Sequence, residues 1–279
     1  MKSFRLTWAL GEVFDASNFS KHRVALRSPL KFWVALATKL VPKVWHPSIR
    51  LHLKRGGTFD VSEFMTLYIY KEIFVDGCYD EPRLPRSDPV IVDVGANTGL
   101  FAIRMLQLYP HADLHCYEPM PTNFLALQKN LQNSGHKECK TFQEGIGGTT
   151  RNEKLFIHDR NVGGHSIHAA IANNGPSINI HLVNIKTALE RLGGKVCSLL
   201  KLDCEGAEFE ILTSLDDTIA RRIERIVFEP TPTIYKIDVL KRHLETIGYK
   251  VLWNNGVYIA LHCDLPIQQL SPHPQHAKV

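Results

Sequence analysis

No two cysteines in this sequence have the C-x-x-C spacing, so the usual signature of a dithiol redox centre or a zinc-binding knuckle is missing. Several cysteines lie in apolar runs such as Leu114-His115-Cys116-Tyr117. Isolated cysteines of this kind are typical of reduced, mostly buried thiols in a cytoplasmic protein. We therefore expect a cytoplasmic protein without disulfides among Cys78, Cys116, Cys139, Cys197, Cys204 and Cys263.

Long apolar runs are also missing. The longest, from Phe32 to Val41, contains Lys39 and is far shorter than the roughly 20 residues that span a bilayer. Glu12 and Asp15 interrupt the apolar stretch after Arg5, so we do not expect a secretory signal there. The sequence predicts no transmembrane helix.

Acidic residues are scarce at the N-terminus. Residues 1–56 contain 11 Lys and Arg residues but only Glu12 and Asp15, a net charge of +9, which leaves −4 for the rest of the chain. Such a basic region suits an anionic partner, and peripheral contact with an anionic membrane surface is one interpretation. The alternative, which we favour, is a helix that packs against the body of the protein with its cations in water. We expect no nucleic-acid partner, because no recognition motif accompanies the charge.

Apolar runs and helical patterns alternate through the middle of the chain, which is typical of a doubly wound α/β sheet, mostly parallel. Three prolines within residues 81–89 mark a boundary. We expect a basic accessory region (1–88), an α/β domain (89–265) and a flexible tail (266–279). The expected strands are Val90–Val94, Leu114–Tyr117, Phe142–Ile146, Ser198–Leu202 and Arg225–Phe228, closed by an antiparallel hairpin of Lys250–Trp253 and Tyr258–Leu261. The expected helices are Leu100–Tyr109, Thr122–Asn133, Ile185–Leu192, one after Gly206, and Pro232–Ile247. Gly147–Val196 reads as a largely irregular insertion with short alternating pieces such as Ser177–Val183.

The third glycine of a dinucleotide-binding G-x-G-x-x-G motif is absent from the turn after the first of these strands. Val90–Gly99 contains only Gly95 and Gly99, with Asp93 two residues before the first glycine. A carboxylate at this position opposes a phosphate but suits an ammonium group. S-adenosylmethionine has an ammonium and no phosphate, so we expect it as the cofactor, bound by Asp93, Gly95, Asn97 and Gly99.

Two further strand ends extend the expected cofactor site. Glu118, about 25 residues after Asp93, is placed to accept hydrogen bonds from both ribose hydroxyls. The alternative is that Glu118 caps the next helix. Glu144 and Ile146 end the third expected strand, where they would edge the adenine ring.

A dense acidic turn follows the fourth expected strand. Asp203 and Glu205 would lie at the lip of the site, where a carboxylate can orient an acceptor hydroxyl and take its proton. We place Asp203 in both the catalytic and the cofactor-binding sets. Acids in the first turn of a helix are otherwise simply favourable, and we accept that interpretation for Glu208 and Glu210.

Glu229 and His165 complete the catalytic candidates. Glu229 ends the next expected strand, and His165 lies in the insertion, where a solvated loop histidine is the alternative to a base. The spacing of His158, His165 and His168 matches no firm ligand pattern, so we expect no metal. Asp203, Glu205 and Glu229 are the alternative oxygen ligands.

Four segments together resemble the FkbM-type family of S-adenosylmethionine-dependent methyltransferases. They are Tyr70–Tyr79, Val92–Gly99, Tyr117–Pro119 and Lys201–Glu208, and the similarity extends from about Phe64 to Glu229. The chain has Cys204 where a valine is common. The resemblance implies a class I methyltransferase (Rossmann-like) fold and methylation of a hydroxyl on a small-molecule or glycan acceptor, often a sugar or a secondary metabolite. Two alternatives remain, a dinucleotide-dependent oxidoreductase and a catalytically silent binding protein on the same fold. The sequence indicates neither the acceptor nor the oligomeric state.

Overall fold

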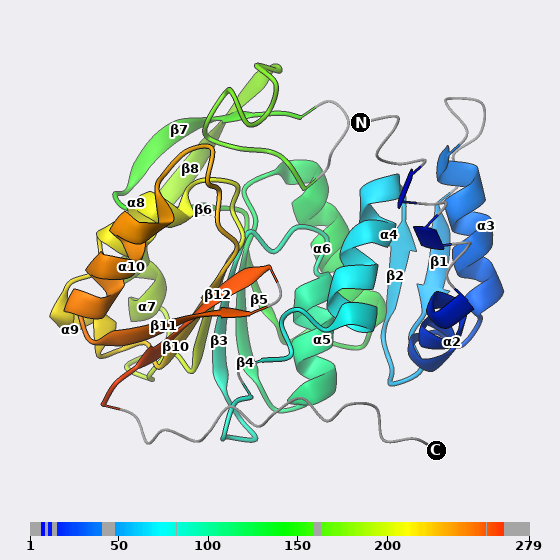
Figure 1. The fold of residues 1–279 in the computed structure, drawn as a ribbon, viewed down its shortest axis with the longest axis horizontal. Coiled ribbons are helices and arrows are strands. Elements are labelled where there is room, and N and C mark those ends of the chain that lie inside the picture. The colour runs from blue at the N-terminus through cyan, green and yellow to red at the C-terminus, as the bar shows by residue number, and fades with distance from the viewer. Residues whose placement is uncertain are drawn as a thin grey trace.

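A twisted sheet forms the centre of the protein (Figure 1). In the computed structural model, which describes residues 7–8, 11–12, 16–40, 48–81, 83–158, 163–254 and 256–264, this sheet has seven strands in the order β11-β12-β10-β9-β3-β4-β5. The strands are β3 (Val90–Val94), β4 (Asp113–Tyr117), β5 (Lys140–Phe142), β9 (Leu199–Leu202), β10 (Arg225–Phe228), β11 (Tyr249–Asn254) and β12 (Val257–His262). The expected tail, 266–279, lies outside the described residues.

The pairing of these strands confirms the expected class I methyltransferase sheet. β5, β4, β3, β9 and β10 pair in parallel, whereas β12 runs antiparallel to β10 and to β11. Every residue of β3 is buried, as its unbroken apolar sequence predicts for a strand that is covered on both faces. Ile91 points into one core cluster, and Val90, Val92 and Val94 point into the other.

Helices cover both faces of the sheet (Figure 1). They are α5 (Leu100–Leu108), α6 (Pro121–Asn133), α7 (Ile185–Glu190), α8 (Glu208–Thr213), α9 (Asp217–Ala220) and α10 (Ile237–Thr246). The last begins later than expected, because residues 232–236 form a turn in which the Ile234 N–H donates to the Thr231 carbonyl at 2.9 Å. The β11–β12 hairpin is confirmed.

The third expected strand, Phe142–Ile146, is wrong as a single element. The chain leaves the central sheet after β5 and enters a second sheet at β6 (Gly145–Gly147), which pairs with β8 (Ser177–Asn184). Gly145 permits this contact, because a side chain there would meet Leu182. β8 also pairs with β7 (Arg151–Phe156), so the region expected to be irregular contains most of a three-stranded sheet.

The N-terminal region forms a layer at one end of the molecule (Figure 1). It contains α2 (Ala16–Ala25), α3 (Pro29–Leu40), β1 (Ile49–His52), β2 (Thr58–Val61), α4 (Phe64–Tyr70) and the π-helix η1 (Lys71–Asp76). α3 buries Phe32, Ala35 and Leu36 and packs against β1 and α4, as the packed-helix interpretation expects. Its cations are not all in water, since Lys39 is buried and burial lowers its pKa. No helix within the described ranges has both the length and the apolar character that crossing a membrane requires.

Candidate active site

A cavity of about 240 Å³ opens where β3, β4, β9 and β10 reach their carboxyl ends. Ligands of open α/β sheets bind at this edge. The residues that line it are Met65, Tyr68, Ile69, Glu72, Val94, Gly95, Asn97, Glu118, Pro119, Asn123, Gly145, Ile146, Leu155, Gly163, His165, Ile167, Ile180, Leu182, Asp203, Cys204, Glu205, Ala207 and Glu229. The cavity thus contains Gly95, Asn97, Glu118, Ile146, Asp203, Glu205, His165 and Glu229 from the expected site, but not Asp93, Gly99 or Glu144.

The turn after β3 is shaped by glycine and asparagine. Gly95 and Asn97 both have positive φ, 75° and 49°, a region that few residues other than glycine and asparagine adopt. A Cβ on Gly95 would lie only 1.9 Å from the Asp203 carbonyl oxygen, so this turn and the acidic turn touch backbone to backbone. Asn97 lines the cavity, and its buried side-chain oxygen has no hydrogen-bond partner among the described residues.

Asp93 lies beneath this turn, not in the cavity. Its side chain is 0% exposed, and Oδ1 is 3.1 Å from Lys201 Nζ. Lys201 also donates to the Gly95 carbonyl at 2.9 Å. Burial alone would lower the pKa of Lys201, but Asp93 and Asp203 outweigh it and raise that pKa. The carboxylate that the sequence assigned to a cofactor ammonium is therefore paired with a lysine inside the protein.

Gly99 and Glu144 also serve the fold. Gly99 begins α5 with φ 86°, and a Cβ there would meet the Leu127 side chain at 2.7 Å, so it allows α5 and α6 to pack closely. Glu144 pairs with Arg191 at 2.6 Å. Ile146, two residues further along, lines the cavity, whereas Glu144 does not.

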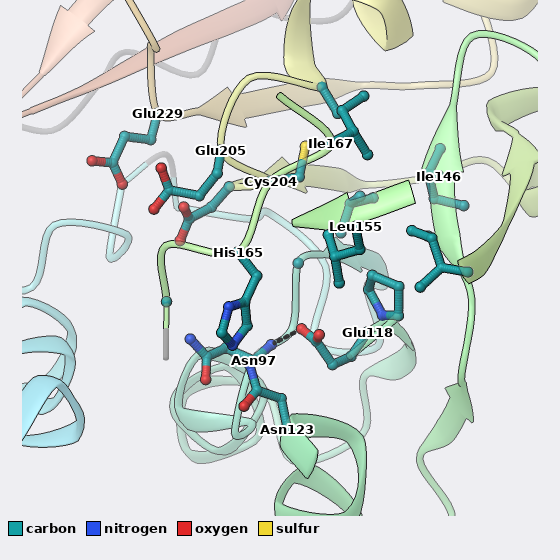
Figure 2. A pocket seen from close by; sticks show the side chains of 18 of the residues that line it. Asn97, Glu118, Asn123, Ile146, Leu155, His165, Ile167, Cys204, Glu205 and Glu229 are labelled. Atoms are coloured by element: carbon teal, nitrogen blue, oxygen red, sulfur yellow. Dashed lines mark hydrogen bonds between the residues drawn. The ribbon is translucent and has the colours of Figure 1, made fainter. Parts of the chain in front are cut away.

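Glu118 reaches the cavity with both carboxylate oxygens held. Oε2 accepts from the backbone N–H of Asn97 at 2.8 Å (Figure 2). Oε1 accepts from the backbone N–H of Met120 at 2.9 Å. Met120 is the N-cap of α6, so the capping interpretation describes part of its role. Burial raises the pKa of Glu118 to about 7.

Asp203 lies between the Gly95 turn and the remaining acids of the cavity. Its Oδ2 accepts from the Tyr79 hydroxyl at 3.4 Å and lies 3.5 Å from Lys201 Nζ. Lys201 thus contacts Asp93, the Gly95 carbonyl and Asp203 at once. Because a buried amine with three partners has few alternative positions, it fixes Asp203 relative to the glycine turn.

Glu205 and Glu229 lie at the opposite side of the cavity from Glu118 (Figure 2). Both are close enough to Asp203 for its charge to raise their pKa values. Burial, reinforced by Asp203, raises the pKa of Glu205 to about 8. The Asp203 carboxylate is the main cause that raises the pKa of Glu229 to about 9, although Glu229 is exposed at the rim. These shifts favour the protonated, hydrogen-bond-donating form of both side chains. The neighbouring acids Glu208 and Glu210 are used in the fold: Glu208 accepts from the N–H groups of Cys204 and Gly206, and Glu210 pairs with Arg151.

His165 lines the cavity between Glu118 on one side and Glu205 and Glu229 on the other (Figure 2). Its Nδ1 accepts from the His158 backbone N–H at 3.1 Å, and burial lowers its pKa. A neutral ring held in this way carries its proton on Nε2, so it presents a donor rather than a free basic nitrogen. In the parts of the chain that the structure describes, no group of three or more His, Cys, Asp or Glu side chains is arranged to hold a metal ion.

One wall of the cavity comes from the accessory region, which the sequence did not indicate. Met65, Tyr68, Ile69 and Glu72 follow the i, i+3, i+4, i+7 spacing of one helix face, and all four line the cavity. Burial raises the pKa of Glu72 to about 7, and a hydrogen bond with Tyr68 opposes that rise. The spacing is visible in the sequence, but an apolar stripe of this kind normally predicts contact with the core.

Carboxyl groups dominate the ionisable side chains that line the cavity. Its lining contains five carboxyl groups, from Glu72, Glu118, Asp203, Glu205 and Glu229, and no lysine or arginine among the described residues. Sites for phosphate groups normally supply cations or a helix N-terminus free of nearby acids. This cavity therefore suits an uncharged or cationic ligand much better than a pyrophosphate.

Sequence comparison places the same region among methyltransferases. Residues 93–251 match the methyltransferase FkbM domain. Methyltransferase 1 of Beauveria bassiana is 30% identical over 202 residues, which cover 66% of this chain and 81% of that protein. Methyltransferase sdnD of Sordaria araneosa is 30% identical over 225 residues, covering 69% and 85%. The 31-O-demethyl-FK506 methyltransferase FkbM of Streptomyces tacrolimicus is 28% identical over 211 residues, covering 64% and 80%.

Proposed function

Because this chain belongs to the FkbM-domain family of methyltransferases, we propose that it transfers a methyl group from S-adenosylmethionine to a hydroxyl of a sugar, glycan or secondary metabolite. The observation that carries the proposal is the cavity at the carboxyl ends of the parallel strands, with five carboxyl groups and no lysine or arginine in its described lining. The name of the Streptomyces relative refers to O-methylation, which supports a hydroxyl acceptor.

The residues of the cavity fit S-adenosylmethionine. This cofactor carries an electrophilic methyl group on a sulfonium, and its charged groups include no phosphate. Glu118 would accept hydrogen bonds from the ribose, and Ile146 with Leu155 and Leu182 offers an apolar surface for the adenine. The Asn97 side-chain oxygen has no hydrogen-bond partner among the described residues and would supply an acceptor beside the Gly95 turn.

Asp203 is the residue we propose to orient the acceptor. It lines the cavity beside the Gly95 turn, and Lys201 and Tyr79 hold its Oδ2. An alcohol is a poor nucleophile, so a carboxylate that accepts its proton as the new bond forms would assist transfer. Asp203 and burial favour the protonated forms of Glu205 and Glu229, and His165 offers Nε2–H, so these three are proposed to hydrogen-bond the acceptor.

The oxidoreductase alternative is disfavoured by the acidic cavity, because the pyrophosphate of a dinucleotide would lie among carboxyl groups. A catalytically silent protein would bind S-adenosylmethionine but transfer nothing. Cytoplasmic location remains a proposal; it draws support from the six cysteines, all within the described residues and all unpaired.

A mass-spectrometric screen tests the proposed reaction. Candidate glycans and hydroxylated secondary metabolites are incubated with the protein and S-adenosylmethionine, and each is examined for the mass gain of one methyl group. We expect a methylated product with the wild type and at least a tenfold slower reaction with Asp203→Asn at similar cofactor affinity, the scale of a lost general base. Product formation at the wild-type rate by Asp203→Asn would remove Asp203 from the mechanism.

A further inference from the structure

Two turns of the N-terminal accessory region lie side by side. The turn between α2 and α3 and the turn between β1 and β2 are joined by two backbone hydrogen bonds, from Arg27 N–H to the His52 carbonyl and from Lys54 N–H to the Ala25 carbonyl, both 2.9 Å. A bridge between Leu26 and Leu53 lies between them. The surface formed here, called the basic corner, contains Arg23, Val24, Arg27, Leu30, Lys31, Lys54 and Arg55.

The basic corner is rich in exposed basic side chains. Arg23, Arg27, Lys31, Lys54 and Arg55 are all exposed. None of these five side chains takes part in an ion pair between described residues. The sequence has no Asp or Glu from Ala16 to Phe59, so the corner has no acid of its own to neutralise them. Arg50, in contrast, pairs with Asp60 at 2.7 Å.

Apolar side chains stand among these cations. Val24 is 75% exposed and Leu30 71%, the two highest values among the large exposed apolar side chains of the described residues. Each is next to a basic residue in the sequence, Val24 after Arg23 and Leu30 before Lys31. Val34, one turn after Leu30 on α3, is also exposed, and Phe19 on α2 stacks on Trp33 at 6.3 Å. Exposed apolar side chains next to exposed cations are typical of an interfacial membrane-binding surface.

We propose that the basic corner docks on an anionic lipid surface. Lysine and arginine would lie at the anionic headgroups, and Val24 and Leu30 would insert between them. A second copy of the chain is a poorer occupant, because two such corners would oppose like charges. A nucleic acid would satisfy the cations but leave Val24 and Leu30 without an apolar partner.

Vesicle co-sedimentation of the full chain tests this proposal. We expect binding to vesicles of phosphatidylcholine mixed with phosphatidylglycerol, loss of binding in high salt, and little binding to phosphatidylcholine alone. Arg27→Gln and Lys54→Gln should each lower the partition coefficient about fivefold, and Leu30→Asp should also lower it. Val239→Asp is the matched control, since Val239 is an exposed apolar residue on α10 at the other end of the molecule (Figure 1), and it should bind like the wild type.

Each other outcome contradicts the proposal. Equal binding to neutral and anionic vesicles, no binding to either, or equal loss with Val239→Asp would overturn it. Circular dichroism and urea unfolding of each variant identify a loss of binding that reflects misfolding; in that case the exposed-charge variants Arg27→Gln and Lys54→Gln decide the question. Binding to duplex DNA without binding to anionic vesicles would assign the corner to nucleic acid instead.

Discussion

Burial raises the pKa of Glu118 to about 7, so its proposed hydrogen bonds to the ribose should depend on pH near neutrality. Ribose hydroxyls donate to the ionised carboxylate more strongly than to the carboxylic acid. The affinity for S-adenosylmethionine should therefore rise as the pH increases from 6 to 8. Glu118→Ala should weaken binding by about 1–3 kcal/mol and abolish this pH dependence.

Calorimetry at several pH values measures both effects. Glu144→Ala is the control, since Glu144 also follows a strand of the central sheet but pairs with Arg191 outside the cavity. An affinity that does not change with pH, or an equal loss with Glu144→Ala, would remove Glu118 from the ribose role.

At the level of single residues, the sequence placed at the cavity those whose position follows from a local pattern, and their roles remain proposals. Gly95, Asn97, Glu118 and Asp203 all lie at the ends of buried strands, and parallel strands end at one edge. Asp93 lies in the same pattern, but its partner Lys201 is 108 residues away in the sequence. A local sequence pattern does not reveal such distant pairs, which is why we expected Asp93 to contact the ligand.

The turn between β3 and α5 is the element on which the site depends most. Gly95→Ala should lower the free energy of unfolding by several kcal/mol, because φ is positive and a Cβ would collide with the Asp203 backbone. Gly135→Ala is a matched control with φ 84° and open space around the Cβ position. It should cost only about 1–2 kcal/mol, the conformational part alone. Urea unfolding compares the two; equal losses would show that the close contact has no energetic role.

Glu72, in the cavity wall formed by α4 and η1, should make the stability of the protein depend on pH. The folded pKa of Glu72, about 7, lies above its ordinary value of 4.5, so the folded state holds a proton that the unfolded state releases between these pH values. Glu72 therefore costs stability progressively as the pH rises from about 4.5 to 7. Glu72→Gln should stabilise the protein more at pH 8 than at pH 4, as measured by urea unfolding. The same difference at both pH values would contradict this.

Among the elements, the sequence predicted the strands of the central sheet better than their surroundings. Continuous apolar runs followed by glycine or acidic turns identified β3, β4, β9 and β10. The run Phe142–Ile146 was misread, because an apolar run does not indicate the point at which the chain passes from one sheet to another.

The accessory region and the α/β domain share one hydrophobic core. The same cluster contains Phe32 from α3, Leu84 from the proline-rich segment, and Phe101 from α5. The Leu84 N–H donates to the Tyr109 hydroxyl at 2.9 Å, so the segment expected as a boundary is packed against the domain. The three prolines indicated a boundary, but the packing of one leucine is a tertiary property that composition does not reveal. The division at residue 88 remains a proposal.

Phe32→Ala tests whether this core folds as a unit. Phe32 is fully buried, so its truncation should lower the free energy of unfolding by about 3–5 kcal/mol. If the core is shared, the protein should unfold in a single transition, measured by circular dichroism. Phe32→Ala should then shift that whole transition. Two transitions, of which only one responds to the substitution, would contradict a shared core.

The central claim is that this methyltransferase uses S-adenosylmethionine in the acidic cavity. Isothermal titration calorimetry of the full chain with S-adenosylmethionine, and separately with NAD, tests it most directly. We expect saturable binding of S-adenosylmethionine, weakened by Glu118→Ala, and no binding of NAD. Binding of NAD without binding of S-adenosylmethionine would contradict it.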